Sequence, residues 1–144
     1  DAFVVNRSQV NRLTTGLVGY WTFDGKDTNS TTAFDRSGNS NSGTLTNSPL
    51  KTVGKLGQGL RFDGADDRVD IAHASSLNLI SAVTMSAWVK HTGSFGSGLG
   101  EFQAIIAKGD TAYRLSLCGT ASTECPENQA VSSFMMGITF PSTQ

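Results

Sequence analysis

The run Phe62–Ile71 constrains the fold of this chain more than any other part of the sequence. It reads Phe-Asp-Gly-Ala-Asp-Asp-Arg-Val-Asp-Ile, so a glycine turn with four aspartates lies between two short segments of alternating character. Alternation with a period of two indicates β-strands, and an Asp-Gly pair is typical of the turn that joins them. Such a turn can hold two strands together, or it can hold a cation.

Strand-like alternation recurs along most of the chain. Its strongest example is 82–91. Val83, Met85, Ala87 and Val89 are expected on one face of this strand, and Trp88 on the other. The other expected strands are 17–23, 44–47, 59–63, 68–72, 103–108, 112–118 and 132–140. Sixteen glycines among 144 residues suit short strands joined by tight turns. We therefore expect an all-β protein, built as a two-sheet antiparallel sandwich.

Length and charge limit the organisation and the partners. A chain of 144 residues has room for one domain, which we place at 17–144, after an arm or linker at 1–16. The arm has neither a strand nor a helix period, so it is either a linker or a strand donated to a neighbouring chain.

A formal net charge of −1 provides no basic field for nucleic acid, and no apolar run is long enough to span a membrane.

Several motifs together resemble the laminin-G-like (concanavalin A-like) jelly-roll family. They are an aromatic-rich segment ending in Phe-Asp-Gly, an Asp-x-Ser-Gly-Asn turn, a glycine-rich strand and the strand around Trp88, at Leu17–Gly25, Asp35–Leu45, Gly54–Gly64 and Thr84–Lys90. The resemblance spans about Gly16 to Phe140 and implies a jelly-roll sandwich. Because lectins, adhesion modules, glycosidases and spacers all share this architecture, it does not fix the function.

The resemblance ends before the family pattern does. Family members usually continue with a Trp-x-His-Val-like strand and a closing Leu-Tyr-Val-Asp-Gly strand, and this sequence contains neither. We therefore expect a jelly roll whose C-terminal part is absent. Three explanations stay open: a longer natural chain, a second chain that supplies the strands, or a shortened fold. Open strand edges would favour pairing with another chain.

Oxygen-bearing side chains in the turns predict a structural Ca²⁺. The resemblance implies an ion where the opening strand meets a glycine turn, which points to Asp24. The full candidate set is Asp24, Asp35, Asn39, Asp66 and Asp67. The alternative for each position is an Asx turn that caps a strand end without any metal.

The sequence favours binding over catalysis. Glycosidases of this architecture carry paired carboxylates on one strand, and none of the expected strands contains such a pair, so we expect no enzyme activity. An aromatic ring exposed to water can stack on a sugar. The candidate ligand-binding rings are Trp88, Phe95 and Tyr113, with Tyr20 as a further possibility. Each ring has the alternative role of packing in the core.

Two further features concern the compartment. Cys118 and Cys125 enclose a short polar loop and are expected to form a disulfide if the compartment is oxidising. Asn29-Ser30-Thr31 is a sequon, as is Asn6-Arg7-Ser8, and either accepts a glycan only in a glycosylating secretory pathway.

We expect an extracellular or cell-surface module that binds a glycan or a surface protein. The alternative is a structural subunit that joins copies of itself through the arm and open strand edges.

Overall fold

The computed structural model describes residues 15–92, 102–109, 112–118 and 133–138. Its regular elements are short strands and two 3₁₀ turns, η2 (Gly25–Asp27) and η3 (Ser75–Leu77). The chain divides into two compact units, residues 1–78 and 79–144, which we describe separately. Every strand pair is antiparallel. The protein is therefore all-β in its described part, as the sequence predicts.

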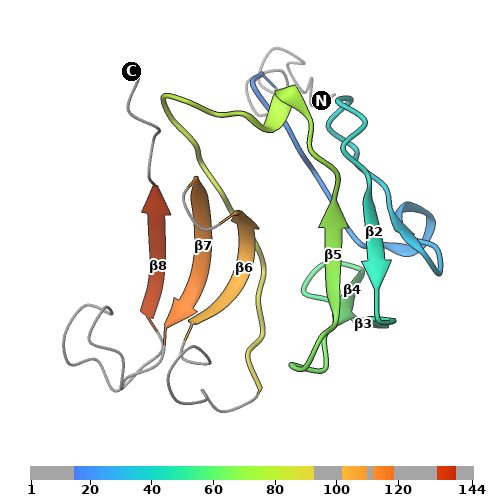
Figure 1. Cartoon of the computed structure of the whole chain (residues 1–144). Helices are drawn as coiled ribbons and strands as arrows, with labels where there is room; N and C mark the ends of the chain where they lie inside the picture. Colours follow the sequence, from blue (N-terminus) through green and yellow to red (C-terminus); the bar gives the residue numbers. More distant parts are fainter. Residues whose placement is uncertain (1–14, 93–101, 110–111, 119–132, 139–144) are drawn as a thin grey trace, which may run out of the picture. The chain divides into compact units, whose positions relative to one another are not determined.

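The first unit contains a three-stranded sheet and a hairpin (Figure 1). The sheet has the order β1-β2-β5, with bounds Thr32–Ala33, Gly43–Thr46 and Arg68–Ile71. The hairpin consists of β3 (Leu50–Val53) and β4 (Gln58–Arg61). In the sheet, Gly43 is buried where a Cβ would lie 2.5 Å from Cγ1 of Val69. The absence of a side chain lets β2 and the side chains of β5 approach closely.

The second unit contains one sheet of order β6-β7-β8, whose strands lie side by side in Figure 1. The bounds are Phe102–Lys108, Tyr113–Cys118 and Ser133–Ile138, and a register shift interrupts the β6–β7 ladder between Ala104 and Ile106. The central strand β7 supplies the core, because Tyr113, Leu115 and Leu117 are all at most 9% exposed.

Six strands agree with the sequence prediction to within two residues at each end, and they are β2, β4, β5, β6, β7 and β8. Two short strands, β1 and β3, were not expected. The expected strand 17–23 is wrong, because this segment joins no ladder in the described part of the chain. Its backbone bonds instead to a loop: the amide of Arg36 donates to the carbonyl of Tyr20.

The expected strand 82–91 is also wrong within the described residues. The burial of its side chains follows the expected alternation only in part, since Val83 and Met85 are half-buried but Ala87 and Val89 are exposed. Alternating side chains specify two faces, whereas a strand also needs a neighbour for its backbone N–H and C=O groups. No described strand pairs with this segment. The two-sheet jelly-roll arrangement therefore stays a prediction.

The hairpin turn between β3 and β4 leads to a stability prediction. Gly57 has a φ of +62°, and a Cβ there would lie 2.8–2.9 Å from the carboxylate of Asp24. We expect Gly57→Ala to lower the free energy of unfolding by about 2–3 kcal/mol, since it combines left-handed strain with that clash. Urea-induced unfolding measures the change.

Gly64 provides the matched control for this prediction. Its φ is +82°, but a Cβ there would meet nothing within 4 Å. Gly64→Ala should therefore show the backbone strain alone, about 1–2 kcal/mol. Equal losses in the two variants would mean that the contact with Asp24 does not constrain the turn.

Candidate functional site

The carboxylate of Asp35 organises the loop between β1 and β2. One oxygen accepts hydrogen bonds from the backbone amides of Tyr20 (2.9 Å) and Ser37 (2.8 Å). The other accepts from Oγ of Ser37 (2.7 Å) and the amide of Asn41 (2.9 Å). These four donors match the four lone-pair positions of a carboxylate. Asp35 therefore joins the segment before η2 to the loop that leads into β2.

Two asparagine side chains complete the same connection. Nδ2 of Asn39 donates to the carbonyl of Leu17 (2.9 Å), and Nδ2 of Asn41 donates to the carbonyl of Val18 (2.7 Å). In the reverse direction, the indole nitrogen of Trp21 donates to the carbonyl of Asn41 (2.9 Å). Both predicted metal ligands of this loop, Asp35 and Asn39, thus make hydrogen bonds that hold the loop against residues 17–21.

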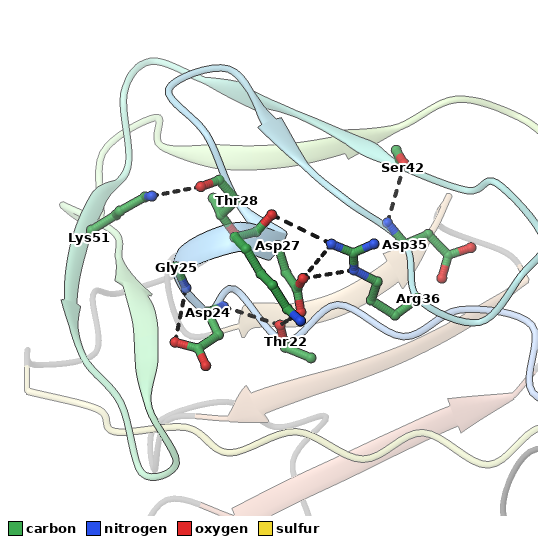
Figure 2. Close-up of polar contacts among 10 residues, drawn as sticks. Thr22, Asp24, Gly25, Asp27, Thr28, Asp35, Arg36, Ser42 and Lys51 are labelled. Atoms are coloured by element: carbon green, nitrogen blue, oxygen red, sulfur yellow. Dashed lines mark hydrogen bonds and ion pairs between the residues drawn. The ribbon is translucent and has the colours of Figure 1, made fainter.

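Asp24 lies at the start of η2 and contacts the β3–β4 hairpin. Its Oδ1 accepts from the amide of Gly25 (2.9 Å), which caps η2, and from the amide of Gln58 (3.2 Å). In Figure 2, Asp24 and Asp35 lie on opposite sides of Arg36 and Asp27. The structure therefore does not bring these two candidate ligands to one site.

The pair of Asp27 and Arg36, drawn at the centre of Figure 2, is the feature that sequence reasoning missed. Asp27 is 7% exposed and accepts from Oγ1 of Thr22 (2.7 Å) and from Nε (2.8 Å) and Nη2 of Arg36. The hydrogen bond from Thr22 and those from Arg36 lower the pKa of Asp27. Arg36 also lies 6.0 Å from the ring centroid of Phe34. Arg36 lies within the Asp-x-Ser-Gly-Asn turn, but no sequence motif pairs it with Asp27.

A cluster of three carboxylates lies in the turn between β4 and β5 and consists of Asp63, Asp66 and Asp67. Within the described residues, it is the one cluster of three or more Asp, Glu, His or Cys side chains that are close enough together to hold a metal ion. One oxygen of each lies within 4.8 Å of the others. Oδ1 of Asp63 accepts from the amide of Ala65 (2.9 Å) and more weakly from those of Asp66 and Asp67. The hydrogen bond from Ala65 is the main reason that the pKa of Asp63 is lowered. The predicted ligands Asp66 and Asp67 thus come together, with Asp63 as a third carboxylate.

The aromatic candidates differ sharply in exposure. Trp88 is 75% exposed and Tyr20 is 52% exposed, whereas Tyr113 is 9% exposed in the core of its sheet. Burial raises the pKa of Tyr113. Phe95 lies outside the described residues. Of the candidate rings that the structure describes, Trp88 and Tyr20 are therefore exposed to solvent, and Trp88 is the more exposed of the two.

The predicted disulfide is not tested by this structure. Cys118 ends β7, and Cys125 lies outside the described residues, so the pairing stays a prediction.

Comparison with known proteins returned no matching family model, no matching characterised protein and no matching solved structure. Within the described residues, no helix has the length and apolar character needed to cross a membrane.

The Asp35 loop predicts a pH dependence of stability. Burial by itself would raise the pKa of Asp35, but its hydrogen bonds from Ser37, Tyr20 and Asn41 together lower it. A pKa that is lowered on folding stabilises the fold above the unfolded-state value of about 3.9. This stabilisation is lost as the pH falls through the folded-state pKa. Asp35→Asn should therefore cost about 1.5–3 kcal/mol at neutral pH, and less as the pH approaches 2.

Ser42→Ala provides the control for this pH profile. Oγ of Ser42 accepts from the amide of Asp35 (3.2 Å), so the variant loses a hydrogen bond of the same loop without losing a titrating group. Its cost in unfolding free energy should be similar at every pH. If the cost of Asp35→Asn were also independent of pH between 6 and about 2, Asp35 would not be held ionised by its donors.

Proposed function

We propose that this chain is a non-catalytic extracellular or cell-surface module that binds carbohydrate through an exposed aromatic ring. The observation that carries the proposal is Trp88, whose side chain is 75% exposed. A large aromatic ring in water presents an apolar face, which suits the apolar face of a sugar ring. Single exposed apolar residues are common, so Trp88 indicates a candidate site that requires a direct test.

The proposal includes a laminin-G-like jelly-roll fold. It is supported by the sequence motifs and by the antiparallel sheets of the described residues. Under this proposal the two-sheet sandwich is completed by further strands, from a longer natural chain or from a second chain. An oxidising location would also allow the predicted disulfide between Cys118 and Cys125 to form.

The ionisation of the aspartates supports a non-catalytic role. A glycosidase needs a carboxylic acid whose pKa is raised so that it can donate a proton. Asp27, Asp35, Asp63 and Asp70 are the described aspartates with a clear shift, and the pKa of each is lowered. Their hydrogen bonds favour the ionised form, which is the wrong state for a general acid at neutral pH.

Replacement of Trp88 tests the binding proposal. On a glycan array, Trp88→Ala should weaken the binding of any retained glycan roughly 10- to 150-fold, because it removes about 1.5–3 kcal/mol of apolar burial. Leu56→Ala is the matched control, since Leu56 is 74% exposed but has no ring. Equal binding by the wild type and Trp88→Ala, or equal loss in both variants, would contradict a site at Trp88.

A second candidate function is that of a structural subunit that joins copies of itself through its arm and open edges. The observation that favours it is the β3–β4 hairpin, where Leu50, Val53 and Leu56 are 60%, 89% and 74% exposed. Particle size in dilute solution separates the two functions. A monomer that retains a glycan supports the binding module, whereas polymers that disappear when residues 1–16 are deleted support the subunit.

We also propose a structural Ca²⁺ at the turn of Asp63, Asp66 and Asp67. Their close carboxylate oxygens support the proposal. Backbone carbonyls and water would have to supply the remaining ligands, since Ca²⁺ takes 6–8 oxygens. Both oxygens of Asp35 and Oδ1 of Asp24 accept the hydrogen bonds described above, as does Oδ1 of Asp63, so an ion bound through those oxygens would have to displace them. Asn39 donates through its nitrogen.

Calcium titration tests this site. Ca²⁺ should raise the unfolding temperature with an apparent Kd of about 10⁻⁴–10⁻³ M, the range of extracellular modules. Asp66→Asn together with Asp67→Asn should abolish the shift. Asp70→Asn is the control, because Asp70 bonds to Thr46 (2.5 Å) and Arg68 (3.0 Å) outside the cluster. An unfolding temperature that stays constant up to about 10 mM Ca²⁺ would rule out a calcium site in this affinity range.

A further inference from the structure

The sequon Asn29-Ser30-Thr31 forms the tip of a tight turn beside β1. An isolated β-bridge pairs Thr28 with Ala33, and the amide of Asn29 donates to the carbonyl of Thr32 (3.0 Å). The three sequon residues between these contacts are all exposed. The fold therefore presents this tripeptide to solvent on a defined turn rather than in the core.

Hydrogen bonds hold the side-chain amide of Asn29 in one orientation. Its Oδ1 accepts from the backbone amides of Thr31 (2.9 Å) and Thr32 (2.7 Å), and from the hydroxyl of Thr31 (3.3 Å). Its Nδ2 donates to no group in the described part of the chain. Since the oxygen makes all the contacts, the nitrogen is the part of the side chain that remains available for chemistry.

Three other asparagines of this unit differ in both respects. Nδ2 of Asn39, Asn41 and Asn47 donates to the backbone carbonyls of Leu17, Val18 and Asp66, respectively. None of the three has Ser or Thr two positions later. Attachment of a group to any of these nitrogens would disturb a hydrogen bond that holds a loop. At Asn29 no such bond is lost.

From these observations we propose that Asn29 is the attachment site of an N-linked glycan. Nδ2 forms a bond to C1 of the first sugar, as the bond from C1 to the diphosphate of a lipid-linked oligosaccharide breaks. The lipid diphosphate leaves, and Nδ2 loses one proton to a base of the transferase. The hydroxyl of Thr31 is the sequon group that contacts the amide of Asn29. The proposal depends on the extracellular location proposed above, because glycosylation takes place on a secretory route.

The site has a consequence for the sheet edge. Asn29 lies three residues before β1, which is the end strand of the β1-β2-β5 sheet. A glycan is bulky and hydrophilic, and end strands are the places where sheets pair with other chains. A sugar on Asn29 would therefore oppose pairing at this end of the sheet.

Peptide mapping tests the proposal on the full chain secreted from a eukaryotic host. We expect the Asn29 peptide to carry an oligosaccharide that an amidase removes, which leaves Asp at position 29. Thr31→Val should abolish the modification, and Thr31→Ser should retain it, because only the latter keeps the hydroxyl. Mapping separates this peptide from the second sequon at Asn6.

An unmodified Asn29 peptide would overturn the proposal if a control glycoprotein from the same cells carried its glycan. Modification that persists in Thr31→Val would also overturn it, since the sequon would then play no part. Thermal unfolding of the two Thr31 variants checks that each variant is folded. The result is independent of glycan binding at Trp88: loss of array binding with a modified Asn29 contradicts the binding module alone.

Discussion

The carboxylate of Asp35 is the interaction on which the first unit depends most. The loop between β1 and β2 has no ladder partner, so its amides need another acceptor. Asp35 supplies that acceptor for three backbone amides and one hydroxyl at distances of 2.7–2.9 Å. Because one of these amides belongs to Tyr20, the same carboxylate also fixes the segment that the sequence predicts as a strand. That segment joins no ladder in the described part of the chain, and its hydrogen bonds go to the loop.

This use of aspartate limits where a cation can bind. An oxygen that accepts N–H groups directs its lone pairs at those donors, and a metal must replace them. Both oxygens of Asp35 are occupied in this way, and so is Oδ1 of Asp24 and of Asp63. In contrast, the carboxylate of Asp66 accepts no hydrogen bond from the described part of the chain. Residue type is the same for all these aspartates, so only the structure shows which carboxylate oxygens already accept N–H groups.

The sequence was sufficient for strands in which alternation and a neighbouring turn coincide, such as β4 and β5 on either side of Gly64. It was insufficient where pairing decides, because periodicity specifies the two faces of a segment but not whether another strand lies beside it. For this reason the alternation at 82–91 predicts a strand that the described residues do not form, and the sequence does not predict β3. The candidate site shows the same division. Asp66 and Asp67 adjoin in sequence and were predicted together, whereas Asp27 and Arg36 meet across nine residues and no local pattern reveals them.

The distribution of exposed apolar side chains bears on the choice between a binding module and a structural subunit. A ligand that stacks on one ring needs one exposed face, as Trp88 offers. The β3–β4 hairpin differs, because Leu50 and Val53 have opposite parity along β3 and therefore lie on its two faces, and both are exposed. A two-stranded hairpin is only marginally stable in water without further packing. A hairpin exposed on both faces is better suited to contact with strands of another chain than with a sugar, so the two candidate functions depend on different residues of this chain.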